Sequence, residues 1–272
     1  MLIAPAGGAK AQRAGAQPFV VRGRTLPVRP LRHSLLPVLL CLLLSGPAVH
    51  GADRRLVYTG ETYPWLAAVG RLSVPGERRV EGRYSYFLED CSATLVARPA
   101  AAHADTIITA WHCLEHYRDL SRPITFRLGE TPGKILEMEA TRVADGGGMH
   151  ADWAILRLRE PVPASHTPAL PVGAQGADRG APVIMAGFSR DEGLGRGGEV
   201  LTYDPGCRIT GQVRRSADTD CTAHKGSSGG AVVQVSGSGE ARLCGVISEG
   251  DGSGYSRFVP VGAFRGVIEL HL

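Results

Sequence analysis

The stretch CTAHKGSSGGAVVQV, residues 221–235, places two adjacent serines among glycines immediately before a β-branched run. A phosphate-binding loop of the Walker type ends in Lys next to Ser or Thr and is followed by a helix. Here Lys225 precedes the glycines, and the residues that follow predict a strand. The stretch therefore indicates either a turn between two strands or a loop that carries a nucleophilic serine.

Short apolar segments bounded by turn residues continue on both sides of this loop. They predict strands at 64–74, 92–98, 106–112, 124–129, 135–144, 153–158, 181–188, 199–204, 207–213, 230–235, 242–248 and 255–261. Because the sequence between them lacks a long helical pattern, they predict an all-β fold of barrels or a sandwich. Residues 261–272 predict a short C-terminal helix.

Residues 1–51 are typical of an export leader. Six basic and no acidic side chains are followed by the apolar run LLPVLLCLLL (35–44) and by small residues that fit cleavage after Gly51. Ten residues fall short of the roughly 20 that span a bilayer. An organelle transit peptide and an uncleaved anchor are the alternatives. Export predicts a secreted or periplasmic protein without stable membrane insertion after the leader is removed.

The charge distribution argues against a nucleic-acid partner. Six of the 30 Lys and Arg lie in the leader, so the rest of the chain carries 24 basic and 26 acidic side chains, a net charge of −2. A body without a basic surplus lacks the electrostatic footprint of a polyanion-binding protein. Five cysteines remain outside the leader, and none form a CxxC pair, so the sequence predicts no zinc site.

A nucleophilic serine needs a base, and the base needs an orienting acid. Among nine histidines, His112 alone directly follows an apolar strand segment and adjoins a cysteine, in TIITAWHC (106–113). A disulfide between Cys91, at the start of the preceding strand segment, and Cys113 would clamp the turn that carries His112.

Asp152 is the favoured acid because it immediately precedes the apolar strand segment WAILRL, where its carboxylate can be partly desolvated. Asp105 and Asp145 are the alternatives. Asp105 precedes the histidine strand and is expected at its wrong end. Asp145 lies in the glycine-rich turn ADGGG and is expected to be solvated.

The order of TAWHC (109–113), DWAIL (152–156) and GSSGGA (226–231) resembles that of the trypsin-like, chymotrypsin-fold serine proteases, and in pattern their bacterial secreted members most closely. The similarity extends over roughly residues 57–262. It implies two packed six-stranded antiparallel β-barrels with a short C-terminal helix. The implied organisation is a leader at 1–51, a first barrel at 52–160, a connector at 161–182, and a second barrel with the helix at 183–272.

The resemblance implies a role for each candidate residue. The pattern G-x-S-G-G makes Ser228, rather than Ser227, the nucleophile. His112 would take its proton, Asp152 would orient the imidazole, and the backbone N–H groups of Gly226 and Ser228 would form the oxyanion hole. The implied activity is that of a monomeric serine endopeptidase that cleaves protein or peptide substrates without a cofactor or metal.

The resemblance also implies a substrate pocket lined by Thr222, Ser248, Glu249 and Gly250. Thr222 stands where a carboxylate would select Arg or Lys, so strong selection of basic residues is not expected. Ser227 is neutral where animal digestive members carry Asp. We therefore expect the oxyanion turn to form without cleavage of a propeptide.

The remaining cysteines favour a Cys207–Cys221 disulfide, with Cys221–Cys244 as the alternative and a buried thiol at the excluded position. Two other functions compete with proteolysis. A catalytically silent homologue would act as a binding protein, although silent relatives usually lose one of the three residues. An esterase of the α/β-hydrolase type would have the order Ser, acid, His and more helices.

Overall fold

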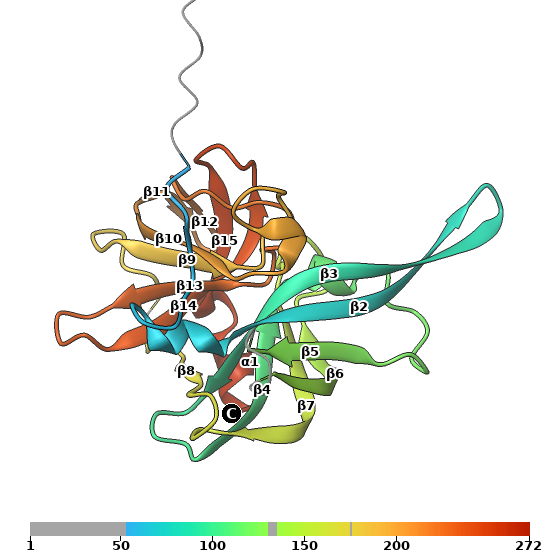
Figure 1. Ribbon diagram of the computed structural model, residues 1–272, viewed down its shortest axis with the longest axis horizontal. Helices are drawn as coiled ribbons and strands as arrows, with labels where there is room; N and C mark the ends of the chain where they lie inside the picture. Colours follow the sequence, from blue (N-terminus) through green and yellow to red (C-terminus); the bar gives the residue numbers. More distant parts are fainter. Residues whose placement is uncertain (1–52, 130–134, 175) are drawn as a thin grey trace, which may run out of the picture. The chain divides into compact units, whose positions relative to one another are not determined.

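A computed structural model describes residues 53–129, 135–174 and 176–272 (Figure 1). The leader expected at 1–51 lies outside the described residues. Over the described residues the chain is mostly β, with short 3-10 helices and one α-helix. In this part of the chain no helix has the length and apolar character that crossing a membrane would require.

The first sheet closes on itself. Its strands are β2 (Val69–Val80), β3 (Arg83–Ala97), β4 (His103–Thr109), β5 (Ile124–Leu128), β6 (Leu136–Asp145), β7 (Ala154–Pro163) and β8 (Leu170–Pro171). They pair in the order β2-β5-β6-β7-β4-β3, and the additional pairing of β2 with β3 completes a six-stranded antiparallel barrel. β8 adds to β3 as a short parallel strand.

The second sheet is antiparallel and contains eight strands. They are β1 (Leu56–Val57), β9 (Val183–Gly187), β10 (Thr202–Cys207), β11 (Ile209–Val213), β12 (Ser216–Thr219), β13 (Ala231–Val235), β14 (Ala241–Gly250) and β15 (Ser256–Pro260). Their order is β1-β10-β9-β13-β14-β15-β12-β11. β10 lies next to one edge of this sheet, and β11 forms the other edge. Because only Arg208 separates the two strands in the sequence, the chain passes directly from one edge region to the other.

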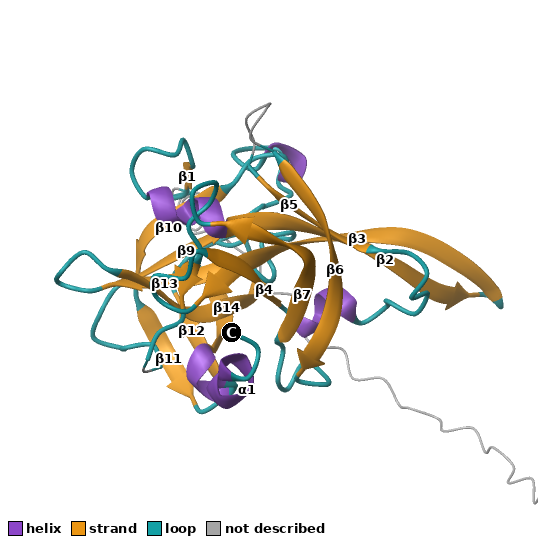
Figure 2. Cartoon of the chain, turned by 90° about the horizontal axis from the view of Figure 1, so that it is seen from below, coloured by secondary structure: helices purple, strands orange, loops and turns teal. Residues whose placement is uncertain are grey.

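The helices are short. The 3-10 turns are η1 (Pro64–Ala68), η2 (Trp111–Leu114), η3 (Arg196–Gly198) and η4 (Val261–Ala263), and the α-helix is α1 (Arg265–Glu269) near the C-terminus (Figure 2). The all-β fold class with a short C-terminal helix is thus confirmed. The strand expected from residue 64 instead begins at Val69, because Pro64 sits in the first turn of η1, where proline fits well.

A continuous hydrophobic core lies inside the barrel and extends to the second sheet. Phe126, Leu95 and Ile107 come from the barrel, while Val233 and Leu243 come from β13 and β14, and all are buried in one cluster. Alternate residues of β5 point inward, as the period of a strand requires. The shared core therefore holds the two sheets together.

The β2–β3 hairpin extends well beyond the barrel as a two-stranded ribbon in both views (Figures 1 and 2). The pairing runs without interruption from Val69 opposite Thr94 to Val80 opposite Arg83. The connecting residues Glu81 and Gly82 both have positive φ. Positive φ at both positions is characteristic of the type I′ turn, whose twist matches that of a hairpin.

Candidate active site

The turn that carries His112 is fixed at both ends. β4 ends at Thr109, and the chain enters the 3-10 turn η2 through Ala110. A disulfide joins Cys113 of η2 to Cys91 of β3, with 6.2 Å between the two Cα atoms. The pairing is the one that the sequence favoured. It holds the backbone of His112 against the barrel wall.

His112 and Asp152 are in direct contact. The Nδ1 atom of His112 lies 2.9 Å from Oδ2 of Asp152, and the backbone N–H of His112 donates to Oδ1 at 2.9 Å. The Asp152 side chain is only 1% exposed, and the Ser248 hydroxyl donates a further hydrogen bond to it. The carboxylate therefore holds Nδ1 of the imidazole in its protonated form and leaves Nε2 as the proton acceptor.

The environment raises the pKa of His112 above the ordinary value of 6.5. Burial by itself would lower this pKa, because it disfavours the imidazolium. The hydrogen bond and charge of Asp152 outweigh the burial, and the more distant carboxylates of Glu89 and Glu115 act in the same direction. His112 is thus a stronger base than a solvated histidine.

Asp105 and Asp145 are occupied elsewhere. The Asp105 carboxylate forms an ion pair with Arg157. Asp145 accepts the N–H of Gly147 within its own turn, at 2.8 Å. Of the three acids considered, Asp152 is the one in contact with His112.

The glycine-rich loop makes a tight turn around Ser228. Gly226 has φ +94°, and a Cβ atom there would lie 2.5 Å from the carbonyl oxygen of Phe188, so the position needs glycine. Ser227 is buried, and its hydroxyl donates to the carbonyl of His224 at 2.6 Å. The N–H of Gly230 closes the turn onto the Ser227 carbonyl at 2.9 Å.

Ser228 is linked to the His112–Asp152 pair through Ser248, and within the described part of the chain its hydroxyl is not hydrogen-bonded to the imidazole. Its hydroxyl lies 3.5 Å from the carbonyl oxygen of Ser248, the residue whose own hydroxyl contacts Asp152. Catalytic hydrogen bonds are often long or misaligned without substrate and tighten in the complex.

Within the turn formed by residues 226–230, two N–H groups lack a partner in the described part of the chain, as do those of the three preceding residues, Ala223 to Lys225. The N–H groups of Ser227, Gly229 and Gly230 all donate to backbone carbonyls. Those of Gly226 and Ser228 have no hydrogen-bond acceptor among the described residues. These are the two donors that the sequence assigned to an oxyanion, and such unpaired donors favour a negatively charged oxygen at this place.

Ser92 joins the barrel to the loop and was missed in the sequence. Its N–H donates to the Ser228 carbonyl at 2.8 Å, and its hydroxyl donates to the Gly226 carbonyl at 2.9 Å. The same hydroxyl accepts the N–H of Phe188 at 2.8 Å. The one available signal was its position directly after Cys91.

The expected pocket residues lie on two segments that face each other. Thr222 is buried, and its N–H donates to Asp204 at 3.0 Å. Glu249 is exposed and lies 3.6 Å from Arg257, so its charge is paired at the surface. Gly250 approaches Ala223 closely: a Cβ atom at Gly250 would lie 2.3 Å from the Ala223 carbonyl oxygen.

A second disulfide links the segment before the glycine loop to β10. It joins Cys207 and Cys221, the favoured pair, with 5.1 Å between the Cα atoms. Cys244 is a buried free thiol whose sulfur donates to the Val232 carbonyl, and burial raises the pKa of this thiol. The bridge thus fixes the chain at Cys221, five residues before the turn that begins at Gly226.

Comparisons with known proteins give a family and a similar fold. The family described as the trypsin-like peptidase domain matches residues 91–241. The fold is similar to the active form of the Rv3671c protease from M. tuberculosis, with TM-score 0.54 and 18% identity over 76% of this chain and 81% of that one. A serine-to-alanine mutant of Rv3671c from M. tuberculosis H37Rv, in an inactive form, gives TM-score 0.50 and 18% identity over 76% and 87%. No curated protein matches the sequence.

Proposed function

The chain belongs to the trypsin-like peptidase family, whose domain matches more than half of its length, and from this we propose that it is a serine endopeptidase. Its secretion is a separate proposal that rests on the leader alone. The buried Asp152 carboxylate that holds the imidazole of His112 beside the Ser228 turn is the observation on which the peptidase function depends. The unpaired N–H groups of Gly226 and Ser228 support the same proposal.

In the proposed reaction, Oγ of Ser228 attacks the carbonyl carbon of the scissile peptide bond, and its proton passes to Nε2 of His112. The resulting oxyanion accepts hydrogen bonds from the N–H groups of Gly226 and Ser228. The C–N bond then breaks, and the leaving amine takes the proton from His112. Water hydrolyses the Ser228 ester by the same steps in reverse roles, which releases the acid and restores the hydroxyl.

The test is covalent labelling of the full-length protein with a fluorophosphonate, together with cleavage of a peptide library. We expect the wild type to react, and Ser228→Ala to lose both labelling and cleavage. Ser238→Ala, which removes an exposed hydroxyl in the β13–β14 loop, is the matched control and should behave as wild type. A folded wild type that neither reacts nor cleaves would favour the silent binding homologue.

Export is proposed from the leader alone, which combines a basic segment with an apolar run of ten residues. The test is cell fractionation of the full-length chain and of a chain starting at Ala52. We expect the full-length chain in the exported fraction with its N-terminus trimmed, and the shortened chain inside the cell. Retention of the intact full-length chain in the membrane fraction would contradict export.

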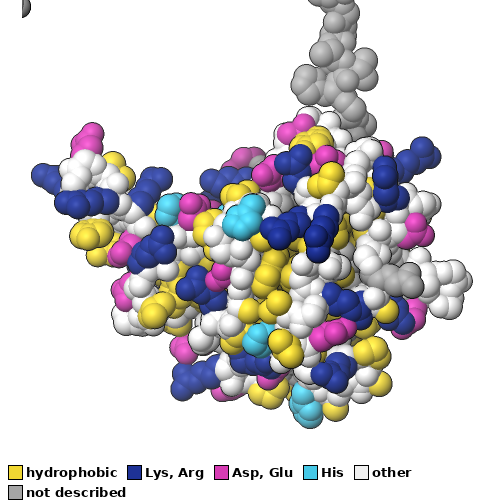
Figure 3. Space-filling model, turned by 180° about the vertical axis from the view of Figure 1, so that it is seen from behind, with side chains coloured by type: hydrophobic (Ala, Val, Ile, Leu, Met, Phe, Trp, Pro, Cys, Tyr) yellow, Lys and Arg dark blue, Asp and Glu magenta, His cyan; other side chains and the backbone are white. Residues whose placement is uncertain are grey.

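The surface agrees with a protein substrate rather than a polyanion. On the face seen in Figure 3, basic side chains are interspersed with acidic ones over the molecule and the projecting ribbon. The net charge of −2 outside the leader supports the same view. Protein and peptide substrates are therefore the proposed partners.

A further inference from the structure

A buried guanidinium lies under the glycine loop and has no part in the reaction described above. The Arg55 side chain is 2% exposed, and it lies near Thr222 and Ser227. Two carboxylates surround it: Nη2 lies 2.7 Å from Asp53, and Nη1 lies 2.8 Å from Asp191. Burying an unpaired charge costs free energy, so the buried Arg55 guanidinium needs these two ion pairs.

Asp191 belongs to a loop, residues 188–198, that reaches the oxyanion site. One oxygen of its carboxylate accepts the N–H of Gly195 at 3.3 Å, and its backbone carbonyl accepts the N–H of Gly197 at 2.9 Å. Its neighbour Arg190 donates its backbone N–H to the carbonyl of Lys225 at 2.7 Å. The ion pair with Arg55 thus fixes the loop one residue away from this contact.

The carbonyl of Lys225 decides where the N–H of Gly226 points. The two groups belong to one planar trans peptide and therefore point in opposite directions. While Arg190 holds the carbonyl, the N–H of Gly226 stays on the other side, free for an oxyanion. Release of the 188–198 loop would allow this peptide to turn, which would put a carbonyl oxygen in place of the donor.

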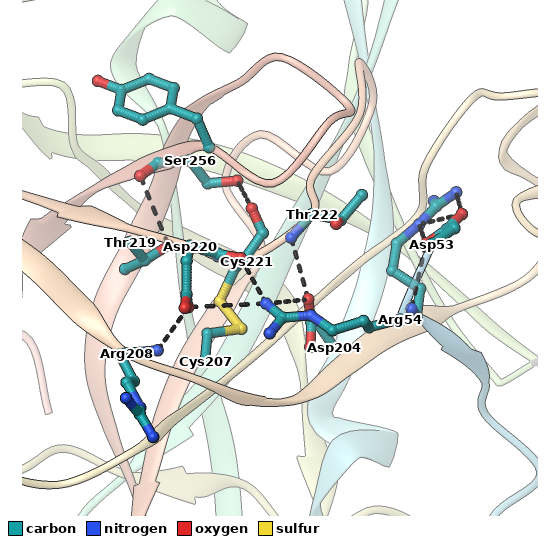
Figure 4. A network of polar contacts seen from close by, with 12 residues as sticks. Asp53, Arg54, Asp204, Cys207, Arg208, Thr219, Asp220, Cys221, Thr222 and Ser256 are labelled. Carbon is teal, nitrogen blue, oxygen red and sulfur yellow. Dashed lines mark hydrogen bonds and ion pairs between the residues drawn. A yellow bond between two sulfur atoms is a disulfide. The ribbon is translucent and has the colours of Figure 1, made fainter. Parts of the chain in front are cut away.

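The preceding residue, Arg54, contacts Asp204 of β10 and Asp220, which directly precedes Cys221 (Figure 4). Its Nη2 lies 3.5 Å from Asp204 and 3.6 Å from Asp220, and it donates to the carbonyl of Asp220. Asp204 in turn accepts the N–H of Thr222 at 3.0 Å. We call residues 53–55 the N-terminal clip, because they contact both the 188–198 loop and the segment that leads into the nucleophile turn.

The clip is held in place by the strand that follows it. Leu56 and Val57 form β1 and pair with Tyr203 and Thr202 of β10. Ser227, the uncharged residue before the proposed nucleophile, donates its hydroxyl to the carbonyl of His224. Because it carries no charge, it cannot form an ion pair with the Arg55 guanidinium. The charge that supports the turn therefore comes from a side chain within the N-terminal segment.

We propose that Arg55 is a positioning residue of the oxyanion hole, which holds the Lys225–Gly226 peptide in its active orientation through Asp191 and the 188–198 loop. The inference rests on the proposed peptidase function. It assigns the assembly of the site to an internal arginine, so assembly needs no newly exposed chain terminus.

The first test compares full-length Arg55→Ala and Asp191→Asn with the wild type in steady-state hydrolysis of a peptide substrate. We expect kcat to fall about 10²-fold, the effect of losing one oxyanion donor, while KM stays within about twofold because both variants keep the hydrogen bond from Thr222 to Asp204 and leave residues 248–250 unchanged. The control is Arg159→Ala, which removes an exposed ion pair with Glu139 on the barrel. A kcat within twofold of wild type for both variants would overturn the proposal.

Chemical rescue separates positioning from general support of the fold. Methylguanidinium at millimolar concentration should restore part of the kcat of Arg55→Ala and should leave Ser228→Ala inactive. If Arg55→Ala does not fold, Arg55→Lys replaces it, since lysine keeps the charge but cannot bridge two carboxylates with a planar fork. We then expect an intermediate kcat at unchanged KM. If the variant loses thermal stability and its KM rises as much as its kcat falls, the role of Arg55 is merely structural and the proposal is overturned.

Hydrogen–deuterium exchange makes the result independent of hydrolysis. In Arg55→Ala, amides of residues 188–198 and 224–228 should exchange faster than in Arg159→Ala, while those of the barrel strands should not. If the wild type has no activity, the peptidase proposal fails, but this exchange pattern would still support the positioning role. Unchanged exchange in both segments would contradict it.

Discussion

At the scale of single residues, the hydroxyl of Ser92 links one backbone carbonyl and one backbone N–H, neither of which is hydrogen-bonded within any described helix or strand. It accepts the Phe188 N–H and donates to the Gly226 carbonyl, in a fully buried position. Buried polar groups left without a partner cost about 1–3 kcal/mol each. The oxyanion turn therefore depends on a residue of the opposite sheet.

We expect Ser92→Ala to lower the free energy of unfolding by about 1–3 kcal/mol, because the Phe188 N–H would remain buried and unpaired. Urea denaturation followed by fluorescence measures it. The control Ser238→Ala removes an exposed hydroxyl and should change stability by less than about 0.5 kcal/mol. Equal stabilities of the two variants would show that the Ser92 hydroxyl is not needed.

The raised pKa of His112 predicts the pH dependence of catalysis. The base must be neutral to accept a proton, so activity is lost as the pH falls through the pKa of His112, which lies above 6.5. We therefore expect the acid limb of the kcat/KM profile above pH 6.5. Glu89→Gln with Glu115→Gln should move this limb to lower pH, since both carboxylates raise the pKa. An acid limb below 6.5 in the wild type would contradict this prediction.

The sequence was informative about residues whose chemistry is written in a short motif. His112, Asp152 and Ser228 each lie in such a motif, and the structure brings the first two into contact, while Ser248 contacts both Asp152 and the Ser228 hydroxyl. Ser92 and Arg55 carry no motif. Their partners are far away in the chain, as Arg55 is from Asp191, and only the folded arrangement reveals them.

At the scale of elements, the projecting ribbon contributes little to the core. Tyr84, Tyr86 and Leu88 are 64%, 61% and 56% exposed, and the opposite strand is exposed from Arg78 to Val80. Ribbon residues therefore bury little apolar surface, and their removal should cost little hydrophobic free energy.

We expect that replacing residues 79–84 by Asn-Gly lowers the melting temperature by less than about 2 °C. Arg78 and Ser85 are directly opposite in the ladder and have the same hydrogen-bonding phase as the Val80–Arg83 pair that flanks the present turn, so a two-residue type I′ turn can join them. The backbone N–H of Glu77, which donates to the carbonyl of His116 at 3.0 Å, is kept. Calorimetry measures the effect, and a drop of more than about 5 °C would show that the ribbon supports the barrel.

The ribbon also marks where element boundaries were unreadable. The sequence predicted separate strands at 64–74 and 92–98, and the structure has strands at Val69–Val80 and Arg83–Ala97. Pro75, Gly76 and a run of charges weaken the strand signal. What stabilises these residues as strands is their mutual ladder, a pairing that local propensity does not report.

At the scale of the whole molecule, the all-β class and the barrel were predictable, because a dozen short apolar segments and the motif order both pointed to them. The addition of β1 to the second sheet was not. A strand of two residues has no readable period, and its pairing with β10 depends on the path of the chain around the second sheet.

The whole fold should lose stability in acid through Asp191. Burial alone would raise the pKa of this carboxyl, but hydrogen bonds from Arg55 and the Gly195 N–H lower it to about 2, against 3.8 when unperturbed. A depressed pKa contributes stability above 3.8 that is lost as the pH falls toward 2. Urea midpoints between pH 5 and 2 should fall less steeply for Asp191→Asn than for wild type. Parallel curves would contradict this linkage.

The hydrogen bond from the Ser92 amide to the Ser228 carbonyl crosses from one sheet to the other. His112 follows β4 of the first sheet, and Ser228, the proposed nucleophile, precedes β13 of the second, so under this proposal neither half is competent by itself. Any stress that separates the halves also moves the reacting atoms apart. Hydrolysis should thus cease as soon as the contact between the two sheets is lost. The rate of turnover would then report whether the two sheets are still packed together.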